Sequence, residues 1–256
     1  MNRLFKNLYD FLVRPVVVYF KMLTGPLWQN KRFRLDYRTS LKKFDLVLSS
    51  KIVQKDLEEI TGGKSSRCQL LSATRRDGNL SLDALYGISR LVKYVNPTRI
   101  FEIGTFNGNT TLQMAVNSRE ECKIFTLDLD GKSSTALTPK YPLSEDDKKY
   151  VGSKEILFQG TPYEKKITRL LGDSAQFDFR PFYGQMDFVF IDGSHVFEYV
   201  KNDTEQAFRM FAPKGVIVWD DYDPSWPDVV RFLNQLARKV NLIWIYGTSL
   251  CIHIRS

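Results

Sequence analysis

From residue 81 onward, short apolar runs alternate with segments of helical periodicity, and this alternation constrains the fold more than any other feature. Ser81 can cap a helix whose apolar positions recur every three or four residues until Asn96 and Pro97 end it. Strands separated by helices predict a parallel sheet that is covered on both faces. The predicted strands are residues 99–104, 123–128, 167–172, 186–192 and 215–221, and the predicted helices among them are residues 109–116, 196–211 and 229–240.

The C-terminal end breaks this alternation. Residues 242–246 and 249–254 read as two strands that are joined only by Gly247 and Thr248, a spacing typical of a β-hairpin. One of these strands must therefore run antiparallel at or near an edge of the sheet. Together the patterns predict an α/β fold: a seven-stranded, mostly parallel sheet with helices on both faces and a C-terminal antiparallel β-hairpin.

The positive charge lies in the first quarter of the chain. The net charge is +8; residues 1–67 hold 14 Lys and Arg against 6 Asp and Glu, and the remaining residues hold 23 of each. We therefore expect a basic N-terminal helical extension at residues 1–67 and a neutral domain at residues 68–256, with an insertion at about 131–166. A main domain without net positive charge is a poor candidate for binding long nucleic acid, so no nucleic-acid partner is expected.

Residues 1–28 carry apolar side chains at helical spacing and basic side chains on another face. Two interpretations stay open: a helix that lies on an anionic membrane surface, or a helix that packs on the protein itself or on a second subunit in a homodimer. No stretch of 18 uncharged apolar residues occurs, so no conventional transmembrane helix is expected. The widely spaced Cys68, Cys122 and Cys251 predict reduced thiols in a cytoplasmic protein, with membrane association left open.

Residues that directly follow the predicted strands are the candidates for ligand binding, because parallel sheets bind ligands at the carboxyl ends of their strands. Glu102 and Gly104 close the first strand, and Phe106, Asn107 and Gly108 follow. The glycines allow a loop to approach a ligand closely, and the next helix offers its N-terminal N–H groups. The acidic residue before the first glycine suits a cationic ligand better than a phosphate.

Further polar residues follow the next two strands. Asp128 ends the second strand and is placed to hold a ribose diol by two hydrogen bonds. Asp173 and Ser174 form a polar turn after the third strand, and this turn is placed to contact an adenine ring.

The ordered series of motifs resembles the class I S-adenosylmethionine-dependent methyltransferases. The Glu-Ile-Gly-Thr-Phe-Asn-Gly-Asn-Thr segment that begins at Glu102 is similar to the first motif of catechol and caffeoyl-coenzyme A O-methyltransferases and of bacterial small-molecule relatives. The resemblance implies a Rossmann-like fold over about residues 81–256 and S-adenosylmethionine as cofactor. It implies that residues 104–108 face the amino-acid part of the cofactor, Glu102 the sulfonium end, Asp128 the ribose, and Asp173 with Ser174 the adenine.

Two later segments refine the resemblance. Asp192 resembles the family's metal-binding aspartate, and His195 stands where those relatives carry a lysine base. Asp220 and Asp221 stand where they show Asp-Asn metal ligands. By position, Asp192, Asp220 and Asp221 would hold Mg²⁺ or another divalent cation, which would lower the pKa of an acceptor hydroxyl.

In this reading Asp192 and His195 are the catalytic residues, Asp192 also borders the cofactor, and His195 takes the proton near neutral pH. The two departures from the family pattern leave a site without metal open as well. A nearby group of aromatic residues, Trp219, Tyr222 and Trp226, either lines a substrate pocket or packs at the end of the sheet.

The function predicted from the sequence is methyl transfer to a hydroxyl of a small-molecule acceptor. The alternatives are a nicotinamide-dependent oxidoreductase, which the glycine spacing opposes, and a non-catalytic or membrane-attached binding protein on the same fold. A nucleic-acid methyltransferase is opposed by the neutral domain. A sugar hydroxyl, a phenol and a lipid-linked acceptor all stay open, and specificity is expected to reside in residues 131–166 and in the N-terminal region.

Overall fold

The computed structural model describes residues 50–63, 67–73, 77–129, 139–152 and 155–255. The amphipathic segment at residues 1–28 and most of the expected N-terminal extension lie outside the described residues. The insertion at 131–166 is described from residue 139 onward, apart from residues 153–154. Residues Lys51–Ser256 form one compact unit, and the architecture below is that of this unit.

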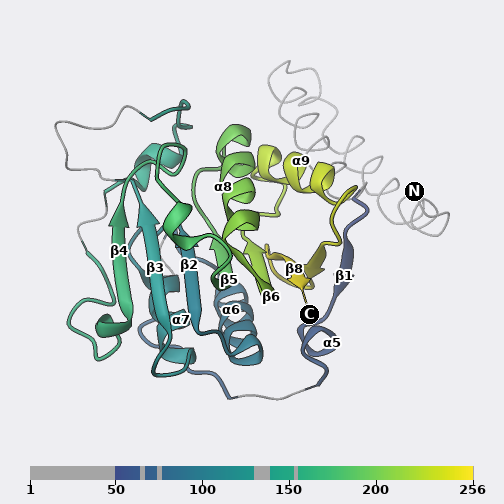
Figure 1. Cartoon of the computed structure of the whole chain (residues 1–256). Coiled ribbons are helices and arrows are strands. Elements are labelled where there is room, and N and C mark those ends of the chain that lie inside the picture. The colour runs from purple at the N-terminus through teal and green to yellow at the C-terminus, as the bar shows by residue number, and fades with distance from the viewer. Residues whose placement is uncertain (1–49, 64–66, 74–76, 130–138, 153–154, 256) are drawn as a thin grey trace, which may run out of the picture. The chain divides into compact units, whose positions relative to one another are not determined.

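The unit is built on an eight-stranded sheet with the order β1-β7-β8-β6-β5-β2-β3-β4 (Figure 1). The strands from β6 to β4 in this order are parallel to one another, β8 is antiparallel to both β6 and β7, and β1 is parallel to β7. The strands are β1 Val53–Lys55, β2 Arg99–Ile103, β3 Lys123–Asp128, β4 Ile167–Leu171, β5 Met186–Ile191, β6 Phe211–Trp219, β7 Ile243–Ile245 and β8 Cys251–Arg255.

This architecture confirms the predicted fold class, with one strand more than the sequence indicated. The additional strand is β1, whose three residues are all exposed and therefore carry no apolar pattern. The connection of the C-terminal hairpin is also longer than expected, because β7 ends at Ile245 and β8 begins only at Cys251.

The helices lie on both faces of the sheet. α6 and α7 pack against each other, as do α8 and α9, and Figure 1 shows the two pairs on opposite faces. The α-helices are α5 Leu57–Thr61, α6 Leu82–Val95, α7 Asn109–Asn117, α8 Phe197–Met210 and α9 Pro227–Leu236, and the short 3₁₀ helices are η2 Asp147–Lys149, η3 Glu164–Lys166 and η4 Arg180–Phe182.

Helix α6 begins and ends where the sequence predicted. The Ser81 hydroxyl accepts a hydrogen bond from the backbone N–H of Ala84 at 3.2 Å and so satisfies one of the free donors of the first turn. Asn96 adopts the left-handed conformation that commonly ends a helix.

Strand β6 begins four residues earlier than expected. Helix α8 ends at Met210 and the strand begins at Phe211, which pairs with Met186 before the register shifts. Gly215 lies at this irregularity with a φ of 148°, and a Cβ there would stand 2.0 Å from the carbonyl oxygen of Asp187. The sequence pattern begins only after this bulge because Pro213 and Lys214 interrupt the apolar run.

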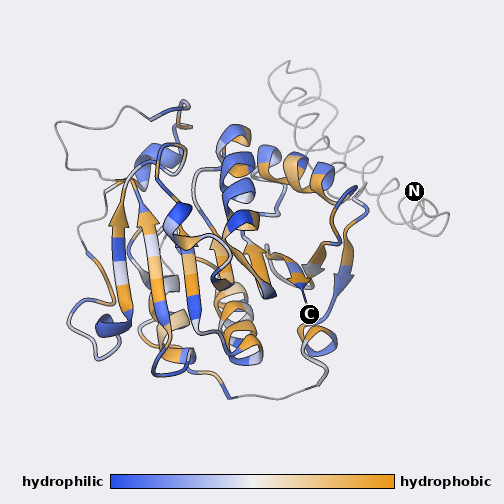
Figure 2. Cartoon of the chain, in the orientation of Figure 1, coloured by the Kyte–Doolittle hydropathy of each residue, from blue (hydrophilic) through white to orange (hydrophobic). Residues whose placement is uncertain are grey.

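The centre of the sheet forms the core. Side chains such as Ile100, Phe188 and Val216 are fully buried, and Figure 2 shows β5 and β6 as largely hydrophobic and α8 as largely hydrophilic. Burial on both faces gives such strands continuous apolar runs. Within the described ranges, no helix has the length and apolar character needed to cross a bilayer.

Candidate active site

Two adjoining cavities lie at the carboxyl ends of the parallel strands. The first cavity is lined by the loops after β2, β3, β4 and β5 together with residues 143–151 of the insertion. The second cavity lies beside it and reaches Asp220, Asp221 and Trp226 after β6. Both are bordered by Gly104, Phe106, Tyr150, Asp192, Gly193 and His195, so a ligand in one cavity lies next to a ligand in the other.

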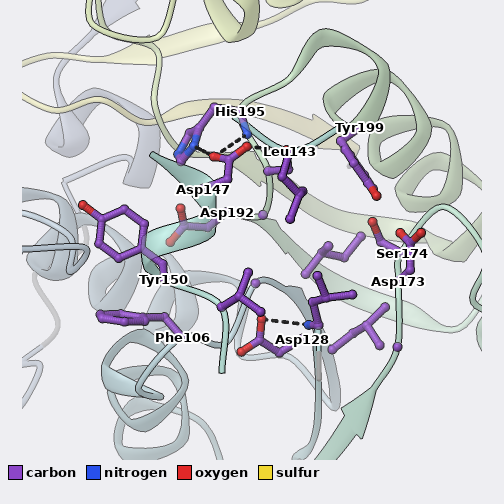
Figure 3. Close-up of a pocket in the computed structure, with 18 residues that line it drawn as sticks. Phe106, Asp128, Leu143, Asp147, Tyr150, Asp173, Ser174, Asp192, His195 and Tyr199 are labelled. Carbon is purple, nitrogen blue, oxygen red and sulfur yellow. Dashed lines mark hydrogen bonds and ion pairs between the residues drawn. The ribbon is translucent and has the colours of Figure 1, made fainter. Parts of the chain in front are cut away.

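Figure 3 shows the first cavity. Phe106 and Tyr150 lie on one side of it, Asp173 and Ser174 on the other, and Asp128 near its base. Both sides consist of loops that directly follow the sheet, as the sequence predicted, except for Tyr150, which comes from the insertion.

Gly104 turns the chain out of β2 at the point where β2 and β5 approach most closely. Its φ is 98°, and a Cβ at this position would stand 1.8 Å from the carbonyl oxygen of Asp192. Its N–H donates to Leu127 at 2.8 Å, and the N–H of Asp192 donates to Ile103 at the same distance. Only glycine fits this turn, and residue 104 borders the cavity.

In the rest of the glycine loop, some residues line the cavities and others only hold the loop in place. Phe106 lines both cavities, and its ring packs edge-on against Tyr150 with centroids 5.4 Å apart. Asn107 lines the second cavity only, and its side-chain oxygen accepts the N–H of Asn109 at 3.1 Å. Gly108 lines neither cavity; it precedes α7 with a φ of 74°, where a Cβ would meet the ring of Phe158 at 2.6 Å.

Glu102 lies behind the wall of the site and supports the loop, so its predicted place near the sulfonium end, through water or the loop amides, stays a prediction. Its side chain is fully buried and lines neither cavity. It accepts hydrogen bonds from the hydroxyls of Thr111 and Thr126, the latter at 2.5 Å, and Thr126 in turn lies 2.6 Å from the hydroxyl of Thr105. Burial raises the pKa of Glu102 to about 8 against the effect of these hydrogen bonds.

Asp128 lines the first cavity at the end of β3. One carboxylate oxygen accepts the N–H of Leu129 at 3.0 Å, and the other is buried without a hydrogen-bond partner among the described residues. Burial raises the pKa of Asp128 to about 6. A buried acceptor without a partner costs free energy, and a ligand that brings two hydroxyl donors would satisfy it.

Asp173 and Ser174 also line the first cavity, but the carboxylate of Asp173 is already occupied. It accepts the backbone N–H groups of Lys140 and Ala175 at 2.8 and 2.9 Å and the side-chain amide of Gln176 at 2.8 Å. Asp173 therefore fixes the loop and its contact with the insertion, and the side chain of Ser174 bonds to the buried Asp203.

Asp192, Asp220 and Asp221 form a carboxylate cluster, in which one oxygen of each lies within 4.8 Å of the others. Burial, and then the charges of Asp220 and Asp221, raise the pKa of Asp192 well above its usual value. Burial and the charge of Asp221 raise the pKa of Asp220 to about 7. Asp221 has a φ of 63°, a conformation rare outside glycine. Three converging oxygen donors that repel one another fit a divalent cation.

His195 lies between two carboxylates. Its Nδ1 contacts Asp147, its Nε2 forms an ion pair with Asp221 at 2.8 Å, and Trp226 stacks on the ring with centroids 3.7 Å apart (interplanar angle 11°). Burial would lower the pKa of His195, but the hydrogen bonds and charges of Asp147 and Asp221 outweigh it and raise the pKa to about 10. In this arrangement the two carboxylates favour the protonated ring, and whether His195 takes a proton in the reaction stays a prediction.

Sequence reasoning missed Asp147 and Tyr150, which reach the site from the insertion. The available signal was the Ser144–Asp147 spacing, typical of a capping pair: Asp147 donates its N–H to the Ser144 hydroxyl at 3.0 Å. Of the aromatic group after β6, Trp226 lines the second cavity. Trp219 and Tyr222 are buried, donating to Thr204 at 2.8 Å and Asn234 at 2.9 Å.

Comparison with known proteins agrees with this geometry. Residues 101–222 match the family model of a methyltransferase domain, and no curated protein matches the sequence. The O-methyltransferase TomG of Streptomyces achromogenes, involved in tomaymycin synthesis and solved in complex with SAM, is 16% identical with a TM-score of 0.50, covering 70% of this chain and 83% of its own. The cofactor-bound protein Rv0187 from MTB is 16% identical with a TM-score of 0.51, covering 84% and 89%.

At these identities the solved structures establish the fold, and the family model identifies residues 101–222 as a methyltransferase domain. The nicotinamide-dependent alternative does not agree with that match. The chain therefore contains a methyltransferase domain, on the fold that it shares with the O-methyltransferase TomG.

Proposed function

We propose that this protein transfers the methyl group of S-adenosylmethionine to a hydroxyl oxygen of a small-molecule acceptor. The observation that carries the proposal is the junction of the two cavities. Gly104 and Asp192 border both of them, with an unsatisfied ribose-type acceptor, Asp128, on one side and the carboxylate cluster on the other.

The cofactor fits the first cavity in one direction. The buried free oxygen of Asp128 suits the two ribose hydroxyls, and the polar turn at Ser174 suits the adenine edge. The glycine loop then faces the amino-acid end, which brings the sulfonium to the junction beside Asp192. The carboxylate of Asp192 there favours the positive charge of the sulfonium.

The acceptor fits the second cavity. Amide side chains of Asn79 and Asn109 line it together with the rings of Tyr150 and Trp226. Of the described residues that line the two cavities, none is Lys or Arg, whereas several are Asp. The carboxylates outnumber the one imidazole of His195 there, so the charge pattern supports a neutral or cationic acceptor over a phosphorylated one.

Asp192, Asp220 and Asp221 would hold a divalent cation such as Mg²⁺ through their oxygens. When bound, such a cation lowers the pKa of an acceptor hydroxyl and so supplies a better nucleophile.

The chain's own residues account for the rest of the reaction. The acceptor oxygen attacks the methyl carbon, the sulfur–carbon bond breaks with its electron pair on sulfur, and S-adenosylhomocysteine leaves. The hydroxyl proton passes to a carboxylate oxygen of the cluster and then to solvent. His195 holds Asp221 through their 2.8 Å ion pair, and the walls of the two cavities align the reacting atoms.

Calorimetric titration with S-adenosylhomocysteine, with and without Mg²⁺, tests the proposal on wild type, Asp128→Ala and Asp178→Ala. Asp178 is an exposed aspartate paired with Arg180 outside both cavities, so its variant is the control. We expect binding to wild type and to Asp178→Ala and a large loss in Asp128→Ala. Failure of the wild type to bind under either condition would reject the proposed function.

A further inference from the structure

Asp147 is a buried carboxylate in a run of solvent-facing charges. Its side chain is 5% exposed, whereas those of the adjacent Asp146 and Lys148 are 56% and 55% exposed. Burial alone would raise the pKa of Asp147, yet the hydrogen bond and charge of His195 hold it at about 2. An ionised carboxylate is buried only where partners compensate for the lost water.

One partner is the backbone N–H of Ser144, which donates to Asp147 at 3.3 Å, and the others belong to the turn between β5 and α8. The Ser194 hydroxyl donates to Asp147 at 2.7 Å, the backbone N–H of His195 donates to it at 3.4 Å, and Nδ1 of the same imidazole completes the set. Figure 3 shows Asp147 directly beside His195 at the rim of the first cavity. Asp147 therefore ties the insertion to the turn that carries Asp192.

The contact continues into the carboxylate cluster. Nε2 of His195 pairs with Asp221 at 2.8 Å, and Trp226 covers the face of the ring. One imidazole thus joins a carboxylate of the insertion to a carboxylate of the cluster. Both ring nitrogens are engaged, which fixes the orientation of the ring.

The insertion also builds one wall of the first cavity. Leu143, Tyr150 and Val151 line it from the residues that flank Asp147. A displacement of Asp147 would therefore move this wall, and it would release His195 from one side at the same time.

We propose that Asp147 is a positioning residue for methyl transfer: it holds residues 143–151 as a wall of the first cavity and fixes His195 against Asp221. The inference rests on the proposed function for its catalytic consequence, whereas the two contacts themselves exist without ligand. Cofactor affinity and the geometry of the carboxylate cluster then depend on the same side chain.

The first part of the test uses the ligand-free full-length protein. Asp147→Asn removes the charge at nearly unchanged size, and Asp146→Asn is the matched control because Asp146 makes only an exposed ion pair with Lys149. We expect amide hydrogen exchange across residues 143–151 to be at least tenfold faster in Asp147→Asn and unchanged in Asp146→Asn.

Imidazole nitrogen NMR adds a signature that a general loss of stability would not produce. The chain has two histidines, and His253 lies in β8, bonded to the carbonyl of Asn241 at 3.0 Å. A His253→Gln variant assigns the two sets of signals. We expect the His195 signals to move in Asp147→Asn and those of His253 to stay in place.

The second part measures S-adenosylhomocysteine affinity, which we expect to be at least fivefold weaker in Asp147→Asn than in Asp146→Asn. Ser194→Ala, which removes one contact of Asp147, should shift exchange and affinity in the same direction by a smaller factor. Unchanged exchange and unchanged His195 signals in Asp147→Asn would overturn the inference. Failure of wild type to bind S-adenosylhomocysteine would instead reject the proposed function, and the exchange and NMR results would still decide the role of Asp147.

Discussion

Gly104 and Asp192 approach each other so closely that the turn after β2 leaves no room for a side chain, with a Cβ of residue 104 placed 1.8 Å from the Asp192 carbonyl oxygen. This contact joins the first glycine of the cofactor loop to a member of the carboxylate cluster. It fixes the position of the junction between the two cavities.

Replacing Gly104 therefore tests the contact directly. We expect Gly104→Ala to lower the free energy of unfolding by about 3 kcal/mol, from the positive φ and the clash together, and to abolish S-adenosylhomocysteine binding. Gly160→Ala is the control, since Gly160 has a φ of 73° but nothing within 4 Å of its Cβ. It should cost about 1 kcal/mol in urea unfolding and leave binding intact. Equal losses in the two variants would show that the clash is relieved by small shifts.

Cofactor affinity should depend on pH through Asp128. Its pKa of about 6 means that the free protein carries a protonated carboxyl below that pH, which accepts hydroxyl hydrogen bonds poorly. We expect S-adenosylhomocysteine affinity to fall by about tenfold for each pH unit below 6. Asp128→Asn, with no proton to exchange, should bind more weakly throughout and lack this dependence. An Asn variant with the wild-type pH profile would assign the titration to another group.

Stability should fall as pH rises from about 4 to 8, because Asp203 is raised by burial to a pKa of about 7 and Glu102 to about 8. The folded protein keeps these protons at a pH where the unfolded chain has already released them. Their stabilising contribution is therefore present at low pH and is lost as pH passes through the folded values.

Asp203→Asn isolates one of these groups, since Asp203 lies under the Ser174 turn and lines neither cavity. Urea unfolding at pH 5 and pH 8 should show a difference that is smaller than in wild type, by up to about 3 kcal/mol. An Asn variant that loses as much stability as wild type over this range would contradict the raised pKa of Asp203.

The carboxylate cluster predicts opposite effects of one substitution on stability and on ligand binding. Asp220→Asn removes a repelling charge, so we expect the metal-free protein to be more stable by about 1 kcal/mol at pH 8. The same variant should lose the rise in melting temperature that Mg²⁺ or Mn²⁺ produces in wild type. Thermal melts with each cation and with EDTA check both effects. A wild type that no divalent cation stabilises would indicate that the cluster works without metal.

Some elements were predictable because their signals are local. Ser81 begins α6 and Asn96 ends it, through side-chain and backbone conformations that the residue types themselves favour. Gly104 and Asp128 follow buried strands, so strand order alone brought them to one edge of the sheet.

Other features depend on tertiary contacts that no local pattern carries. Glu102 and Asp128 are both acidic residues near the ends of neighbouring strands. Glu102 turns toward Thr111 and Thr126, whereas Asp128 borders the cavity. Asp147 has exposed charged neighbours, and its long-range contacts with Ser194 and His195 distinguish it from them. The raised pKa of His195 likewise follows from two carboxylates that are distant in sequence.

The place of β8 in the sheet has a consequence for how the protein is made. Residues 251–255 form an interior strand, and β7 and β1 are connected to the remaining strands only through it (Figure 1). During translation, β1 emerges from the ribosome first but has no route to the rest of the sheet until the strand that joins them has left the exit tunnel. The sheet thus closes with residues near the C-terminus, and a nascent chain arrested before Cys251 would carry β1 as an open edge available to chaperones.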